Sequence, residues 1–177
     1  MILSEKKCKH TPSEEKLTVK DIIGCFVVAV GIVLFFCYVI SIGTVVSGSM
    51  EPTLCTGDIV ISNRLSYVVK EPEMGDIIFF KKDSDIYGKR VVGVAGDHIQ
   101  FANGYVYING EKLNEEYIDS DIATYCYREF HVPDGHVFVM GDNREWSIDS
   151  RYWDEPFVST KDIVAKYLFL IPTHIFV

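Results

Sequence analysis

An uncharged apolar run over residues 22–42 restricts the fold of this 177-residue chain more than any other feature. A helix of that length rises about 1.5 Å per residue and spans roughly 30 Å, the thickness of a hydrocarbon core. The run is rich in β-branched residues, which favour strands in water. In lipid a single segment must be helical, because its backbone polar groups have to be paired internally. The run therefore predicts one N-terminal transmembrane helix.

The charges on either side of this run predict its orientation. Five lysines precede it, and the next basic residue after it is Arg64. Basic flanks stay in the cytoplasm, so we expect residues 1–21 to be a cytoplasmic tail and residues 43–177 to be an extracytoplasmic domain. The alternative is a cleaved signal peptide, which has an apolar region of about 7–15 residues and a small-residue cleavage site. The run is longer, and Thr44, Val45 and Val46 do not match an Ala-x-Ala pattern. We therefore interpret it as an uncleaved, single-pass anchor in the lipid of the cell membrane.

The composition of the remaining residues limits the partners of the domain. Residues 43–177 hold 12 basic against 21 acidic side chains. Nucleic-acid binding is not expected, because phosphate recognition needs clustered Lys and Arg. A disulfide between Cys55 and Cys126 is left open by the sequence. The chain has no CxxC or HExxH pattern, so we expect neither a metal nor a cofactor. We expect a monomer.

Many short apolar or alternating segments, separated by glycine-rich turns, make up the domain. Two Asn-Gly pairs, Asn103-Gly104 and Asn109-Gly110, are each suited to a two-residue type I′ turn between strands. This spacing predicts an all-β, partly barrel-like domain. The expected strands cover residues 58–62, 76–81, 87–94, 98–102, 105–108, 125–132, 136–140 and 163–171.

Ser49, shortly after the apolar run, is a candidate nucleophile if a base lies beside it. The chain offers several candidate bases. His98, His131 and His136 occupy positions typical of structural or surface histidines. Lys89 directly precedes an apolar strand, where burial would lower its pKa into the range of a usable base.

Two further expectations concern charged residues near these candidates. Arg90 should point to the opposite face of the strand from Lys89 and keep its charge in water. Residues 141–153 read Gly-Asp-Asn-Arg-Glu-Trp-Ser-Ile-Asp-Ser-Arg-Tyr-Trp, a polar segment between two apolar strands. We predict a loop with internal ion pairs that also buries Trp146, Tyr152 and Trp153.

Four segments together resemble the successive motifs of the type I signal peptidases, over about residues 22–155. The resemblance implies an all-β serine endopeptidase with a Ser-Lys dyad, which cleaves signal peptides from secreted precursors outside the membrane. A lysine at position 89 resembles the bacterial class, and the short domain resembles the compact Gram-positive type. The segments are Ser-Gly-Ser-Met-Glu-Pro-Thr-Leu (47–54), Gly-Asp-Ile-Ile-Phe-Phe (75–80), Gly-Lys-Arg-Val-Val-Gly-Val-Ala-Gly-Asp (88–97) and the polar segment 141–153.

The resemblance also implies roles for single residues. Ser49 would be the nucleophile, Lys89 the general base, and the Ser47 hydroxyl would join the Ser49 N–H in an oxyanion hole. Ser147 would orient the Lys89 amine. Asp142, Asp149 and Arg151 would form an ion-paired scaffold. Met50, Leu54 and Tyr87 would line pockets that admit small residues at the −1 and −3 positions of the substrate.

Two departures and two alternatives accompany this interpretation. Ala95 stands where the family usually has Pro, and Asp154 stands where Gly often follows the Tyr-Trp pair. The chain could instead be a dedicated peptidase for a few surface or pilus subunits, or a non-catalytic assembly factor. Retention of both Ser49 and Lys89 favours an active enzyme.

Overall fold

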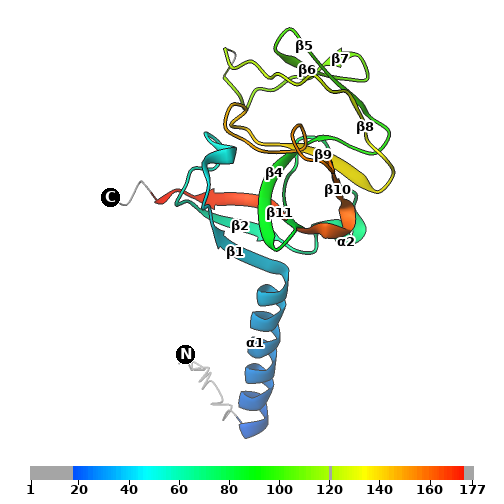
Figure 1. Cartoon of the computed structure of the whole chain (residues 1–177). Helices are drawn as coiled ribbons and strands as arrows, with labels where there is room; N and C mark the ends of the chain where they lie inside the picture. The colour runs from blue at the N-terminus through cyan, green and yellow to red at the C-terminus, as the bar shows by residue number, and fades with distance from the viewer. Residues whose placement is uncertain (1–17, 120, 174–177) are drawn as a thin grey trace, which may run out of the picture. The chain divides into compact units, whose positions relative to one another are not determined.

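A computed structural model describes residues 18–119 and 121–173 (Figure 1), so residues 1–17 of the predicted tail 1–21 lie outside them. The chain divides after Phe36 into two compact units. Helix α1 (Val19–Val39) has 21 residues and is long and apolar enough to cross a membrane. It begins and ends three residues earlier than the predicted 22–42, and its end is set by Ile40–Thr44, which pairs as a strand with residues 59–63.

The second unit is built on a seven-stranded sheet in which the paired strands are antiparallel (Figure 1). Strands far apart in sequence are neighbours, since the C-terminal strand lies between the second and third strands. In spatial order the strands are β1 (Ile40–Thr44), β2 (Ile59–Asn63), β11 (Ile163–Ile171), β3 (Ile77–Lys82), β4 (Asp85–Gly93), β9 (His136–Met140) and β10 (Phe157–Ser159).

A second, four-stranded antiparallel sheet is inserted between β4 and β9. Its hairpins turn at the two Asn-Gly pairs, where Asn103, Gly104, Asn109 and Gly110 all have φ between 52° and 87°. These values confirm the predicted type I′ turns. The strands in order are β7 (Glu111–Lys112), β6 (Tyr105–Ile108), β5 (His98–Ala102) and β8 (Phe130–His131).

The predicted strand over residues 125–132 is wrong except for the two residues of β8. The residues before β8 contact the polar segment 141–153 instead of extending the sheet. Arg128 Nη1 donates to the Trp153 carbonyl at 3.3 Å, and Cys126 Sγ lies 3.9 Å from the Arg151 carbonyl. Short helical segments complete the unit: α2 (Ser66–Val69) and 3-10 turns at Gly48–Met50 and Thr160–Asp162.

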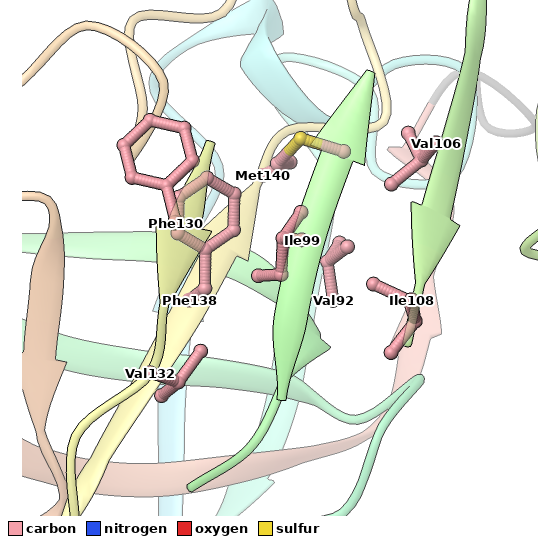
Figure 2. Close-up of a cluster of buried hydrophobic side chains, with 8 residues drawn as sticks. All are labelled: Val92, Ile99, Val106, Ile108, Phe130, Val132, Phe138 and Met140. Atoms are coloured by element: carbon pink, nitrogen blue, oxygen red, sulfur yellow. The ribbon is translucent and has the colours of Figure 1, made fainter. Parts of the chain in front are cut away.

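The main apolar core lies between the two sheets, as Figure 2 shows. Each fully buried side chain of this size contributes about 1.5–3 kcal/mol relative to exposure. The cluster ties β4 and β9 to the small sheet, so the mostly β architecture is confirmed. Its eight buried members are Val92, Ile99, Val106, Ile108, Phe130, Val132, Phe138 and Met140.

Candidate active site

Ser47 and Ser49 lie on either side of Gly48, at the start of a 3-10 turn that buried apolar side chains hold in place. Met50 and Leu54 are each only 2% exposed and pack in one cluster with Val60 and Ile77. The Ser47 and Ser49 hydroxyl oxygens lie 3.4 Å apart. Buried apolar residues therefore fix a short segment whose two serine hydroxyls remain close together.

Lys89 is buried on β4, only 2% exposed. Its Nζ donates a hydrogen bond to Ser147 Oγ at 3.0 Å. Burial lowers the pKa of Lys89 from 10.5 to about 8, because the charged amine loses its water. Asp149 opposes this shift, while the Arg151 charge lowers the pKa further. A substantial fraction of the Lys89 amine is therefore neutral near pH 8.

The loop after β9 packs against both the serine segment and the Lys89–Ser147 pair. Gly141 has no room for a side chain, because a Cβ there would overlap both Ser147 Oγ and the Ser49 carbonyl oxygen. Asn143 donates from its backbone N–H to the Ser49 carbonyl at 3.2 Å, and from Nδ2 to the Gly48 carbonyl at 2.9 Å.

Lys89 and the Ser49 main chain are therefore joined through Ser147 and Gly141. Within residues 18–119 and 121–173, the structure shows no direct hydrogen bond between Lys89 Nζ and Ser49 Oγ.

Buried ion pairs support this loop. The Asp149–Arg151 pair is internal to residues 141–153, as predicted, whereas Asp142 pairs with Arg90 of β4. Arg151 Nε lies 2.8 Å from Asp149 Oδ1, and Arg90 Nη2 lies 2.6 Å from Asp142 Oδ2. The expectation that Arg90 faces water is wrong. Arg90 is only 9% exposed. Met140 of β9 pairs with Arg90, and Asp142, two residues after Met140, is therefore close enough to pair with the buried guanidinium.

The prediction that this loop buries its aromatic side chains is wrong for two of the three. Trp146 is 80% exposed and Tyr152 is 58% exposed. Paired charges occupy the interior of the loop instead, which leaves no buried position for these rings. Trp153 is half-buried and packs edge-on against Phe80 and Tyr87, at centroid distances of 6.1 and 6.4 Å.

A cavity of about 750 Å³ lies beside the two serines. Ser47, Ser49, Met50 and Tyr87 line it, together with residues of β1. Leu54, which was also expected in a pocket, does not line this cavity. Its side chain is buried in the core below the serine segment.

Three residues make contacts at this site that were not foreseen from the sequence. Thr53 Oγ1 donates to Asp142 Oδ2 at 2.6 Å, which ties the serine segment to the Arg90 pair. Asn143 holds the carbonyls of the 3-10 turn, and Arg144 holds the Gly141 carbonyl at 3.0 Å. The clustering of polar residues around Asp142 was a signal for Asn143 and Arg144, whereas nothing local marks Thr53. Cys55 and Cys126 are free thiols.

Comparisons with known proteins show to which family this chain is similar. The family described as signal peptidase, peptidase S26, matches residues 19–171. A probable signal peptidase I-2 of Synechocystis is 36% identical over 92% of this chain and 76% of its own length. The signal peptidase I of Bacillus caldolyticus is 35% identical, over 80% of this chain and 82% of its own.

Coverage differs among the relatives. The matched region spans 57% of the signal peptidase I of Pseudomonas fluorescens, which is 33% identical. A crystal structure of a signal peptidase I from Enterococcus faecalis is 30% identical over 57% of this chain and 99% of that chain, with a TM-score of 0.47. Because the family match covers nearly all the described residues, the chain belongs to the signal peptidase family, peptidase S26.

Proposed function

We propose that this chain cleaves the signal peptides of secretory precursors with Ser49 as nucleophile and Lys89 as general base. Membership of the signal peptidase family supports signal-peptide cleavage by a serine protease. The observation that carries the dyad is the buried Lys89 amine, held by Ser147 in the loop that also contacts the Ser49 main chain. A buried lysine with a lowered pKa can be neutral at the pH where a serine has to be deprotonated.

The proposed reaction is acyl transfer in two steps. Neutral Lys89 takes the Ser49 proton as Ser49 Oγ attacks the scissile carbonyl carbon, and protonated Lys89 then donates that proton to the leaving amine. Lys89 next takes a proton from water as the water oxygen attacks the acyl-enzyme carbonyl, and protonated Lys89 then returns that proton to Ser49 Oγ as the acyl group leaves. Ser147 holds the amine, and the ion pair of Asp149 with Arg151 holds the loop beneath it.

Ser47 supports stabilisation of the tetrahedral intermediate. Its hydroxyl oxygen is 3.4 Å from Ser49 Oγ, so it can donate to an oxygen that forms next to the nucleophile. The Ser49 N–H is the second proposed donor. Both donors belong to one turn anchored by Met50.

The cavity beside these serines is the proposed site of the substrate's small side chains. Met50 and Tyr87 line it, and Tyr87 is braced by Trp153 and Phe80. Walls of this kind admit Ala, Gly or Ser at the −1 and −3 positions and exclude larger side chains. Each added methylene would weaken transition-state binding in such a pocket by about 1–3 kcal/mol.

The α1 helix is compatible with membrane anchoring, and we propose that the lysine-rich N-terminus lies in the cytoplasm. The catalytic unit would then act on the outer face, as a monomer. Protease added to intact cells should therefore digest the unit that follows α1.

The test of the dyad uses the full chain in detergent and a precursor with an Ala-x-Ala site. Ser49→Ala and Lys89→Ala should each lower kcat/KM about 10³-fold or more, the scale of a lost nucleophile or general base. Matched controls are Ser84→Ala and Lys161→Ala, whose side chains are exposed. Activity within tenfold of the wild type in either dyad variant would exclude this mechanism.

A further inference from the structure

Arg144 carries a buried charge whose guanidinium nitrogens all have partners. Its side chain is 0% exposed. Nε donates to the Gly141 carbonyl at 3.0 Å, Nη1 to Thr124 Oγ1 at 3.1 Å, and Nη2 to Glu115 Oε1 at 2.6 Å. Glu115 lies in the segment after β7, outside every motif that marks the family in this sequence. A residue of that segment therefore neutralises the group that holds Gly141.

Tyr117, two residues further on, contacts a second buried guanidinium. The Arg90 guanidinium carbon lies 3.9 Å from the centre of the Tyr117 ring, a distance typical of a strong cation–π contact. The Tyr117 hydroxyl donates to Glu115 Oε1 at 3.0 Å, and the Arg144 guanidinium lies 6.0 Å from the same ring. Glu115 and Tyr117 thus form one brace for both arginines.

Both arginines form hydrogen bonds with the loop that contacts the serine segment. Arg90 forms a forked pair with Asp142, through Nε at 2.8 Å and Nη2 at 2.6 Å. Asp142 accepts the Thr53 hydroxyl, and Arg144 holds the carbonyl of Gly141. A Cβ on Gly141 would overlap Ser147 Oγ and the Ser49 carbonyl oxygen, so the loop backbone is packed closely against both.

We propose that Glu115 and Tyr117 are positioning residues for cleavage, which hold Arg144 and Arg90 so that residues 141–143 stay closed against Ser49 and Ser147. The inference rests on the proposed function, because the groups it positions are those of the Ser49–Lys89 dyad. Without the brace, residues 141–143 separate from the serine segment and water reaches the Lys89 amine. A general base displaced by about 1 Å can cost roughly 10²-fold in rate.

A purely structural brace would give a different result. Loss of such a brace would lower the melting temperature, while the properties of the remaining folded enzyme would not change. The positioning role instead predicts a change in Lys89 itself, because water at its amine reduces the desolvation that lowers its pKa.

The experiment compares two matched pairs in the full-length protein. Tyr117→Leu removes the ring, whereas Tyr117→Phe keeps the ring over Arg90. Glu115→Gln removes the charge that faces Arg144, whereas Glu116→Gln changes an exposed neighbour. Acetylation of the Lys89 amine by acetic anhydride is followed against pH by peptide mass spectrometry. The melting temperature, kcat and KM for the precursor are measured on the same samples.

Tyr117→Leu and Glu115→Gln should raise the Lys89 midpoint by about half a unit or more toward its ordinary value. They should lower kcat about tenfold and leave KM within about threefold. Glu116→Gln should keep the wild-type midpoint, and Tyr117→Phe, which loses only the hydroxyl's bond to Glu115, should shift the midpoint less than Tyr117→Leu.

The inference is overturned if both test variants keep the wild-type midpoint and kcat, or change only the melting temperature. It is also overturned if Tyr117→Phe is as impaired as Tyr117→Leu. A wild-type protein that does not cleave the precursor would refute the proposed function alone, since the acetylation midpoints would still decide the role of the brace.

Discussion

Substitution of Gly141 by alanine tests the central geometric feature of the site. The added methyl would overlap the Ser49 carbonyl oxygen and Ser147 Oγ. Gly141 cannot easily move away, because its N–H donates to Asp149 Oδ2 at 3.0 Å and its carbonyl accepts from Arg144 at 3.0 Å. The backbone at Gly141 is not in the left-handed region, so the effect of alanine is steric.

The magnitude follows from this double overlap. An extra methyl in a filled interior costs about 1–3 kcal/mol of folding stability. A domain with the usual stability of about 5–15 kcal/mol remains folded at that cost. Relief of the overlap has to move Ser147 away from Lys89, or Ser49 away from the loop, until the added methyl lies at an ordinary van der Waals distance from both oxygens. A displacement on the order of 1 Å lowers the rate roughly 10²-fold.

The assay is cleavage of an Ala-x-Ala precursor by Gly141→Ala, with circular dichroism to confirm folding. Gly31→Ala is the control, since a Cβ at Gly31 in α1 meets nothing within 4 Å. We expect kcat/KM to fall about 100-fold in Gly141→Ala and to stay at the wild-type level in Gly31→Ala. A folded Gly141→Ala protein with kcat/KM within threefold of the wild type would refute the claim that this close contact sets the site.

Four further predictions follow from the same structure. The kcat/KM for cleavage should rise with pH and level off above about 8, the pKa of Lys89, because the base must be neutral; a flat profile between pH 6 and 9 would contradict this. Lys89→Met should raise the melting temperature at pH 7, and its advantage should shrink between pH 8 and 10.5, since the native state loses the proton before the unfolded state. Asp149→Asn leaves the buried Arg151 without its countercharge and should cost about 3–5 kcal/mol in denaturant unfolding, whereas the exposed Asp154→Asn should cost almost nothing. Ile99→Ala, at a position 0% exposed between the sheets, should cost about 2–5 kcal/mol; a loss below 1 kcal/mol would be inconsistent with the core described.

Local patterns in the sequence were sufficient for several features of this protein. The apolar run predicts a helix because its length and lack of charge are properties of one continuous segment, and α1 differs from the prediction by only three residues at each end. The Asn-Gly turns were predicted for the same reason, since the positive φ values depend on the two residues themselves. The order of four motifs was enough to indicate the family and to select Ser49 and Lys89 as candidates.

Tertiary structure decided the features that depend on distant partners. Thr53 meets Asp142 across 89 residues, and Arg90 meets Asp142 across 52, so neither contact has a local signal. For the same reason Arg90 was expected in water although it is buried, and Leu54 was expected in a pocket although it packs in the core. The close approach at Gly141 and the brace from Tyr117 likewise arise only when separate segments of the chain fold together. Sequence thus indicated which residues we propose for the chemistry, whereas folding determined what surrounds the Lys89 amine, and that surrounding sets its pKa.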